Sequence, residues 1–318
     1  MTEVARASEP DGVVSCRFCE SPLRQTFVDL GMSPLCQKHL RPDQLSQMEP
    51  FYPLHARVCE RCFLVQVEQV VPPEEIFGDG SYAYFSSYST SWLEHARRYV
   101  ESMIRRLDLK SGDLAVEIAS NDGYLLQYFQ KSGIRALGVE PAANTAAVAQ
   151  ARGIETLVRF FGRETAAETA ARYGRARIMT ANNVLAHVPD INDFIAGIPL
   201  LLAPEGVATL EFPHLMQLVA ENQFDTIYHE HFSYLSFTTV EQMFAAHGLT
   251  LFDVEELPTH GGSLRVMACH ADGSAHPVRA SVEALREREA AAGMRSLDYY
   301  RRFGEQVAET KRKLLEFL

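Results

Sequence analysis

The sequence has no long hydrophobic run, since no stretch approaches the ~18 consecutive apolar residues of a membrane-spanning helix. Residues 1–12 include three acidic residues and lack the basic-then-apolar pattern of a secretory signal. Basic residues are also scarce, because 30 Lys and Arg stand against 41 Asp and Glu, a net charge of −11, and no segment is a basic stripe interleaved with aromatics. These absences predict a soluble, cytoplasmic protein and argue against a membrane or nucleic-acid partner.

Cysteine is too sparse for a disulfide framework, with six in 318 residues. Four of the six form two Cys-x-x-Cys pairs: Cys16 with Cys19, and Cys59 with Cys62. Each pair places two thiolates on one tight turn, and two pairs complete the four-sulfur ligand set that Zn2+ prefers. The pattern therefore predicts a structural zinc site, with a redox dithiol or simple packing as the alternatives. Cys36 and Cys269 lack partners at ligand spacing and are predicted to be ordinary buried thiols.

The length of the chain predicts about two domains of ~150 residues each. Residues 1–12 are expected to be a disordered N-terminus and 13–72 a zinc-binding module. This module is rich in proline and poor in periodic stretches, so it can hardly make a core of its own without a metal. Residues 73–280 are expected to form the main domain, and 281–318 a long amphipathic helix.

The middle of the chain alternates apolar runs with helical patterns, which is typical of an α/β fold. Strands are expected at 114–119, 136–140, 155–158, 177–180 and 207–212, and helices at 92–107, 123–131, 144–152, 190–202 and 239–247. Right-handed crossovers make this a doubly wound, Rossmann-like parallel sheet. The C-terminal helix ends in apolar residues with no exit signal, so it is expected to be cut short or to take part in self-association.

The sharpest motif is a turn of small residues between the first expected strand and its helix, where backbone N–H groups can approach a ligand closely. The candidate cofactor-binding residues are Glu117, Ala119, Asn121, Asp122 and Gly123 around this turn, Glu140 and Pro141 after the second strand, Phe160 and Phe161 after the third, and Asn182 and Asn183 after the fourth. Glu140 stands some 20 residues after the turn, where a ribose diol would be held. A solvated surface acid is the alternative for Glu140.

The composition of the turn distinguishes between cofactors. A phosphate-binding cradle needs more glycine than Ala119, Ser120 and Asn121 provide, and the Asp122 carboxylate would repel a pyrophosphate. An adenosyl ligand with a cationic sulfonium and an amino-acid tail suits the turn better. The sequence therefore predicts S-adenosylmethionine and not NAD.

A second cluster of polar residues runs from Tyr228 to His231 and includes Glu230. A phenol, a carboxylate and two imidazoles flanked by apolar side chains can be desolvated and tuned for acid/base chemistry. The alternatives are a metal shared by His229 and His231, or ordinary surface histidines. Further on, the segment 260–265 places two glycines and Arg265 where they could close on a negatively charged ligand, or form a plain glycine turn.

Taken together, these features resemble the sugar C-3′-methyltransferases, which modify deoxysugars for antibiotics and act on dTDP-linked 4-keto-sugars. The features that carry the resemblance are the four paired cysteines, the turn 117–126, Glu140 with Pro141, the segments 183–187 and 228–231, and the His260-Gly-Gly loop. The resemblance implies that a base removes the proton next to the ketone and that the resulting carbanion attacks the sulfonium methyl. It implies that His231 is this base, with Tyr228 and Glu230 beside it, that His187 and Tyr82 face the sugar, and that zinc is remote and structural.

The chain departs from this family at its C-terminal end. Family members continue after the long helix into a third, Rossmann-like domain that helps to hold the nucleotide of the sugar substrate, whereas this chain ends within that helix. It is therefore expected to be a fragment or to take a different or smaller acceptor. An O- or N-methyltransferase acting on a small natural product and a non-catalytic zinc-module adaptor are the competing functions.

Overall fold

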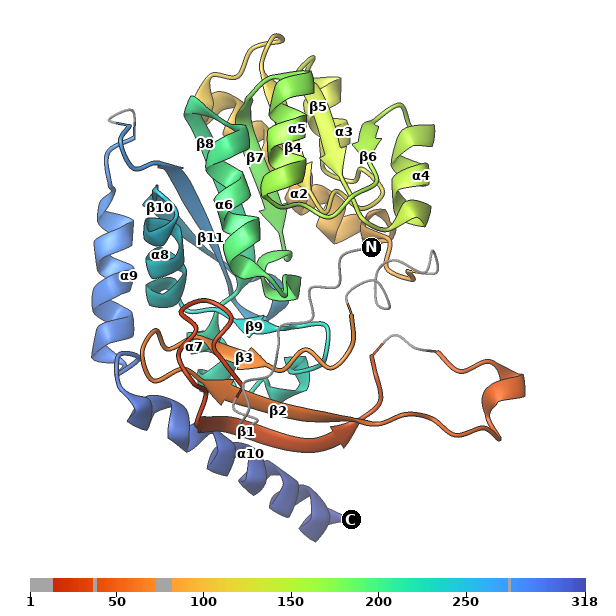
Figure 1. Cartoon of the computed structure of the whole chain (residues 1–318), viewed down its shortest axis with the longest axis vertical. Coiled ribbons are helices and arrows are strands. Elements are labelled where there is room, and N and C mark those ends of the chain that lie inside the picture. Colours follow the sequence, from red (N-terminus) through yellow and green to blue (C-terminus); the bar gives the residue numbers. More distant parts are fainter. Residues whose placement is uncertain (1–13, 37–38, 73–81, 274–275) are drawn as a thin grey trace.

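The computed structural model describes residues 14–36, 39–72, 82–273 and 276–318, and the predicted disordered N-terminus lies outside them. In this part of the chain the strands form two sheets, a large one of seven strands and a small one of four (Figure 1). The two sheets hold different candidate residues from the sequence analysis.

The large sheet has the strand order β10-β11-β8-β7-β4-β5-β6. Its strands are β4 (Leu114–Ile118), β5 (Arg135–Val139), β6 (Glu155–Leu157), β7 (Ala176–Asn182), β8 (Leu202–Pro213), β10 (Leu249–Leu257) and β11 (Ser263–His270). The five strands β4 to β8 are parallel, which confirms the predicted Rossmann-like sheet. Two further strands, β10 and β11, are not among the predicted elements, and β11 runs antiparallel to both β8 and β10 because the loop at 258–262 reverses the chain.

Helices cover both faces of this sheet. They are α2 (Thr90–Leu107), α3 (Leu126–Lys131), α4 (Ala143–Ala151), α5 (Arg163–Tyr173), α6 (Ile191–Leu201), α8 (Phe237–Ala246) and α9 (Ala280–Ala291). One hydrophobic core joins α5, α6, α8 and α9 to the sheet, and a second core joins α2, α3 and α4 to it. Figure 1 shows α5 and α6 crossing the strands on the near side. Short 3-10 turns lie at η1 (Pro42–Gln44), η2 (Ser86–Tyr88), η3 (Leu185–His187), η4 (Phe224–Thr226) and η5 (Thr259–Gly261).

Several predicted boundaries differ from the structure. The helix expected from residue 123 begins only at Leu126, because left-handed residues continue the turn up to Gly123. Strand β8 begins at Leu202, five residues before the predicted strand. Helix α5 is not among the predicted elements, although its Ala- and Glu-rich sequence between Gly162 and Gly174 carries a helix signal.

The small sheet has the strand order β1-β2-β3-β9 and is antiparallel. Its strands are β1 (Gln25–Ser33), β2 (Tyr52–Val58), β3 (Val65–Val67) and β9 (Ser233–Tyr234), and the short helix α7 (Leu215–Ala220) lies beside it. Strand β9 directly follows the candidate acid/base cluster at residues 228–231, so the cysteine-bearing segment and this cluster's segment share one sheet. The module therefore has no independent core, as its length and composition led us to expect.

The predicted long C-terminal helix is two helices, α9 and α10 (Leu297–Phe317), because Gly293 adopts a left-handed conformation between them. Helix α10 packs on β1, where the Phe27 and Phe303 rings stack with centroids 4.6 Å apart. Its last apolar side chains, including Phe317, are exposed. Self-association through this end stays a prediction. None of the helices in the described part combines the length and apolarity that crossing a membrane requires.

Candidate active site and zinc centre

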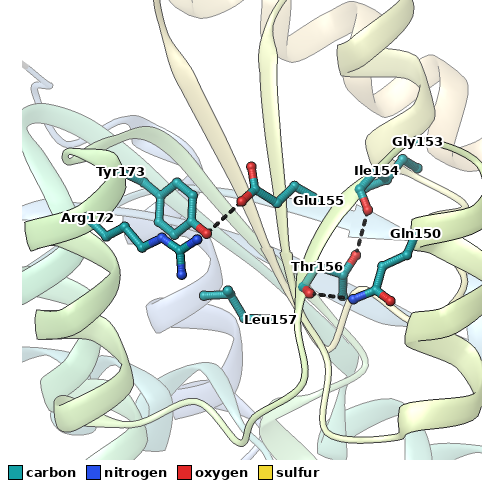
Figure 2. Close-up of a pocket in the computed structure, with 8 residues that line it drawn as sticks. All are labelled: Gln150, Gly153, Ile154, Glu155, Thr156, Leu157, Arg172 and Tyr173. Atoms are coloured by element: carbon teal, nitrogen blue, oxygen red, sulfur yellow. Dashed lines mark hydrogen bonds between the residues drawn. The ribbon is translucent and has the colours of Figure 1, made fainter.

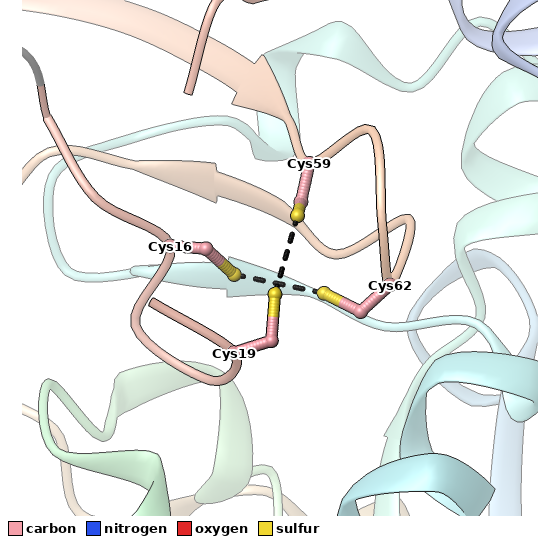
Figure 3. Close-up of side chains that lie close together, drawn as sticks. All are labelled: Cys16, Cys19, Cys59 and Cys62. Carbon is pink, nitrogen blue, oxygen red and sulfur yellow. Dashed lines mark hydrogen bonds between the residues drawn. The ribbon is translucent and has the colours of Figure 1, made fainter. Parts of the chain in front are cut away.

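The four paired cysteines converge on one point from two separate loops (Figure 3). The sulfur atoms of Cys16 and Cys62 lie 3.6 Å apart, those of Cys19 and Cys59 lie 3.5 Å apart, and all four lie within 4.8 Å of one another. Four sulfurs placed tetrahedrally at ~2.3 Å around Zn2+ would be about 3.8 Å apart. The Gln66 amide donates to the Cys16 sulfur at 3.2 Å, the kind of contact that supports a bound thiolate. The thiols therefore fit a structural zinc ion.

The cofactor turn between β4 and α3 has an unusual backbone. Ala119, Asn121 and Gly123 all have positive φ, at 52°, 49° and 78°. Such a conformation disfavours side chains, and non-glycine residues that adopt it cluster at functional sites. Gly123 is also required for space, because a Cβ there would lie 2.4 Å from the Ile154 side chain. The turn thus brings the backbone closely around the carboxyl end of β4.

Glu140 closes this turn from the end of β5. Its two carboxylate oxygens accept hydrogen bonds from the backbone N–H groups of Asn121 and Ala142, each at 2.8 Å. Pro141 lies between Glu140 and Ala142. Burial raises the pKa of Glu140, and the side chain is only 4% exposed. The interpretation of Glu140 as a solvated surface acid is therefore wrong.

Unpaired acceptors gather at the same sheet edge. Both carboxylate oxygens of Glu117 are buried without a hydrogen-bond partner among the described residues, although Tyr124 lies beside them. Burial, together with the charges of Glu140 and Asp122, raises the pKa of Glu117 well above its usual range. The side-chain oxygens of Asn182 and Asn183 are likewise unpaired in the described structure. Buried acceptors in this state call for donors from a ligand, and the ammonium group and ribose hydroxyls of S-adenosylmethionine are such donors.

Asn121 and Asp122 also hold the segment 82–88 over the turn, a role that the sequence did not indicate. The Asn121 side chain accepts from the Ser86 backbone N–H at 2.9 Å and donates to the Tyr84 carbonyl at 3.0 Å. The Ser87 hydroxyl donates to Asp122. A further amide, that of Asn144, donates to the Tyr82 carbonyl at 2.8 Å. These bonds fix Tyr82 above the turn.

The two phenylalanines predicted to bind the cofactor follow β6. Phe161 packs edge-on against Phe194 of α6, with ring centroids 5.3 Å apart, and Phe160 is 42% exposed. Their contact with a cofactor stays a prediction.

His231 lies in a half-buried hydrogen-bonded pair with Tyr228. Its Nδ1 is 2.9 Å from the Thr226 carbonyl oxygen, which can only accept, so Nδ1 carries the proton. Its Nε2 is 2.9 Å from the Tyr228 hydroxyl, which therefore donates to the Nε2 lone pair. Burial, helped by the charges of His187 and His260, lowers the pKa of His231 to about 3. The imidazole is thus a neutral base with its lone pair on Nε2.

His187 stands beside His231, with the two rings 4.7 Å apart and edge to face. Its Nδ1 donates to the backbone carbonyl of Glu230 at 3.0 Å, and burial lowers its pKa to about 4. The structure therefore brings together two neutral imidazoles that are 44 positions apart in the chain.

Glu230 is buried next to the Cys36 thiol, and burial raises its pKa. Burial and the nearby Glu230 charge raise the pKa of Cys36 to about 12, so the thiol stays protonated and donates to the carboxylate. The prediction that Cys36 is an ordinary buried thiol is therefore wrong, because the fold places it at the acid/base cluster. After burial, the charges of Glu230 and Glu140 are the main causes that raise the pKa of Tyr82. Tyr82 thus stands between the acid/base cluster and the cofactor turn.

Geometry also decides the roles of His229 and Arg265. His229 points away from His231 and donates from Nε2 to the Pro53 carbonyl at 3.1 Å, so the two histidines share no metal. Arg265 is buried and its guanidinium is 2.6 Å from the Glu211 carboxylate, so it is not held ready for a negatively charged ligand. His260 of the same segment is near enough to His231 for its charge to help lower the pKa of that histidine, and the His260 ring meets the Trp92 ring edge-on at 5.3 Å.

A cavity of about 470 Å³ lies elsewhere, along the edge strand β6 (Figure 2). The cavity lies between the start of β6 and the end of α5. Polar groups in its lining hydrogen-bond to one another; for example, the Tyr173 hydroxyl donates to the Glu155 carboxylate at 2.6 Å. It is separate from the carboxyl edge of the sheet, where the candidate residues gather.

Comparison with known families matches three parts of the chain. Residues 16–77 match a model described as a zinc binding domain, residues 92–254 a methyltransferase domain, and residues 258–318 a C-methyltransferase C-terminal domain.

Two known proteins and one solved structure are similar to the chain over different lengths. The chain is 37% identical to the C-methyltransferase NovU of Streptomyces niveus over 303 residues, which are 95% of this chain and 71% of that protein. It is 28% identical to the ubiquinone biosynthesis O-methyltransferase of Rhodopseudomonas palustris (strain BisA53), over 33% of this chain and 43% of that protein. Among solved structures, magnesium protoporphyrin IX methyltransferase from Synechocystis PCC 6803 aligns with a TM-score of 0.44 and 13% identity, covering 64% of this chain and 89% of that one. Because a methyltransferase model matches half of the chain and the identity to NovU extends over nearly all of it, the chain belongs to the S-adenosylmethionine-dependent C-methyltransferases.

Proposed function

We propose that this protein transfers the methyl group of S-adenosylmethionine to C-3, the carbon next to the ketone, of a dTDP-linked 4-keto-deoxysugar. The observation that supports this most directly is the half-buried His231–Tyr228 pair, in which a neutral imidazole presents the lone pair of Nε2. Methylation of a carbon next to a ketone requires such a base, because its proton must be removed before the carbon can attack. Methylation of a hydroxyl or an amine makes no comparable demand.

In the proposed reaction His231 Nε2 takes the C-3 proton, and the electron pair of the C–H bond moves into an enolate. The Tyr228 hydroxyl donates to this Nε2 in the structure. If the Tyr228 hydroxyl donated its hydrogen bond to the ketone oxygen instead, the Nε2 lone pair would become free. The same hydrogen bond would stabilise the negative charge that develops on the ketone oxygen. When bound, S-adenosylmethionine would supply an electrophilic methyl group: the enolate electron pair would form the new C–C bond as the sulfonium S–CH3 bond breaks, and S-adenosylhomocysteine would leave. Tyr82, between Glu140 and Glu230, is placed to contact both ligands.

The unpaired acceptors near the turn support the cofactor placement. Glu117 would accept from the ammonium group, and its buried negative charge would then be compensated. Glu140 retains acceptor capacity beyond its two backbone bonds and would accept from the ribose hydroxyls. Asn182 and Asn183, at the end of β7, would complete the polar lining.

Glu140→Ala is expected to weaken S-adenosylmethionine binding about 100-fold, because it removes the ribose acceptor and releases two charge-assisted backbone hydrogen bonds that shape the turn. Isothermal titration calorimetry measures the change. Glu155→Ala is the matched control, since Glu155 is an exposed acid on the neighbouring strand β6. Equal affinities of the two variants would contradict the assignment.

The two half-buried, neutral histidines predict different pH responses for rate and stability. The pKa values of about 3 for His231 and about 4 for His187 lie below the ordinary value of 6.5. Below pH 6.5 only the unfolded chain takes up these protons, so each histidine should lower the free energy of unfolding by about 1.4 kcal/mol per pH unit. The value of kcat/KM should not fall through pH 6.5, because the base stays neutral.

Denaturant unfolding and initial rates measured between about pH 7.5 and 5 check both responses. The His231→Asn variant should show a shallower loss of stability with pH, because one of the two protons is no longer taken up. An acid limb in kcat/KM centred near pH 6.5 would contradict the assignment of a buried neutral base.

The proposed function is tested by incubating the protein with S-adenosylmethionine and a dTDP-4-keto-deoxysugar in deuterated water. Exchange at C-3 without methyl transfer, followed by a product with a new carbon–carbon bond to methyl in its NMR spectrum, is the expected result. A methyl group on oxygen or nitrogen would overturn the proposed acceptor atom. Failure to bind S-adenosylmethionine in calorimetry would favour a non-catalytic adaptor.

A further inference from the structure

Arg17 is a buried cation within the first zinc knuckle, only 6% exposed. Its guanidinium donates to the Val67 carbonyl at 2.6 Å and to the Pro189 carbonyl at 3.1 Å. The guanidinium carbon also lies 5.3 Å from the centre of the Phe232 ring, within the range of a cation–π contact. One side chain therefore joins three segments that are 50, 172 and 215 positions away in the sequence.

Two of these segments carry the histidines of the acid/base cluster. Pro189 follows His187 by two residues, and Phe232 directly follows His231. The two imidazole rings lie 4.7 Å apart. Arg17 contacts the segment of each one, through the Pro189 carbonyl on the His187 side and the Phe232 ring on the His231 side.

The backbone of Phe232 also joins the His187 segment to β3. Its N–H donates to the Ala186 carbonyl at 2.7 Å, next to His187, and its carbonyl accepts from the Val67 N–H at 3.0 Å. Val67 ends β3, and Gln66 beside it contacts both the Arg17 backbone and the Cys16 sulfur. The zinc ligands, β3 and the catalytic segment are therefore linked by a short chain of direct contacts.

We propose that Arg17 is a positioning residue for the methyl-transfer reaction, holding the His187 and His231 segments at their working separation from within the zinc knuckle. The proposal rests on the proposed role of His231 as the base. Arginine suits this task because its planar fork can donate to two carbonyls while its face covers an aromatic ring, which a lysine ammonium cannot do. Zinc is then remote from the chemistry but coupled to it through this side chain.

The test compares Arg17→Lys with Arg61→Lys in the zinc-loaded chain. Arg61 is the matched control, because it is the arginine of the second zinc knuckle, one position further along that knuckle than Arg17 is along the first, and it is exposed. Both variants keep the charge and all four thiols, so both are expected to hold one zinc per chain by metal analysis. Arg17→Lys is expected to lower kcat about 100-fold, since small displacements of catalytic groups have effects of this size, while KM for S-adenosylmethionine stays within about twofold of the control.

A readout that needs no sugar substrate separates this proposal from the proposed function. Amide hydrogen exchange of residues 228–234 should become about tenfold faster or more in Arg17→Lys, with exchange in α2 unchanged. If wild-type protein methylates no keto-sugar, the proposed function fails, and the exchange measurement still decides the positioning role. Exchange and kcat equal to those of Arg61→Lys at full zinc occupancy would overturn the proposal.

A second variant covers the case in which Arg17→Lys does not fold. Phe232→Leu removes the ring that faces Arg17 but leaves both guanidinium hydrogen bonds and the zinc ligands in place. It should also accelerate exchange in residues 228–234 and lower kcat with little change in KM for S-adenosylmethionine. A purely structural Phe232 would instead reduce the melting temperature and leave kcat per folded molecule unchanged, which would overturn the proposal.

Discussion

His231→Asn is expected to lower methyl transfer by about 10³-fold and to abolish deuterium exchange at the carbon next to the ketone, because general-base catalysis contributes on this scale. The asparagine amide can still donate to the Thr226 carbonyl, so the local fold should persist. It has no basic lone pair to replace Nε2, so proton removal should stop. The affinity for S-adenosylmethionine should change little, because the cofactor residues gather at a different strand end.

The measurements are single-turnover methylation and NMR-detected exchange on the same enzyme preparation. His229→Asn is the matched control, since it makes the same replacement two residues away in a histidine that points to the Pro53 carbonyl. That variant is expected to keep its exchange rate per folded molecule, even if it unfolds at a lower temperature. Exchange that persists unchanged in His231→Asn would show that another group is the base.

Cys59→Ser is expected to abolish zinc binding and most of the folded protein. A four-cysteine zinc site contributes roughly 10 kcal/mol or more to folding, which is comparable to the entire stability of a typical domain. Loss of the metal here should spread beyond the module, because its sheet includes β9, which follows the proposed acid/base cluster, and its core includes α10. Both should unfold with it.

Zinc per chain, the soluble fraction and thermal unfolding with and without a chelator check this expectation. Cys269→Ala is the control, because Cys269 is a buried thiol of the large-sheet core and belongs to no metal cluster in the described residues. It should lose some stability and keep its zinc. A soluble, metal-free and fully active Cys59→Ser variant would rule out the structural role of the metal.

The zinc ligands could be predicted, and the turn between β4 and α3 could be proposed as the cofactor site, because both signals are short in sequence. A Cys-x-x-Cys spacing places two sulfurs on one turn whatever surrounds it. The strand, small-residue turn and acid of Glu140 similarly mark one edge of a parallel sheet, because the carboxyl ends of its strands meet there. The Tyr228 to His231 cluster is local in the same sense, since all its members lie within four residues.

The errors share one cause, which is contact between distant residues. Arg265 looked available for a ligand until the fold paired it with Glu211, 54 positions away. Cys36 looked like an ordinary thiol until packing brought it to Glu230. The β10–β11 hairpin adds to the large sheet at β8, with β11 between β8 and β10. Local hydrophobic periodicity does not specify which edge strand a hairpin will pair with, so this placement could not be predicted.

The sequence alone therefore determined the chemistry that this protein can hold: four thiolates for a metal, a cofactor turn, and a phenol, carboxylate and imidazole cluster. Only the tertiary structure decided how these groups are held. It assigned the protons on the His231–Tyr228 pair, placed Tyr82 between Glu140 and Glu230, and joined the zinc knuckle to the catalytic segment through Arg17. The physical reason is that spacing along a chain specifies local geometry, whereas burial and hydrogen bonding between distant segments are decided when the sheets pack together.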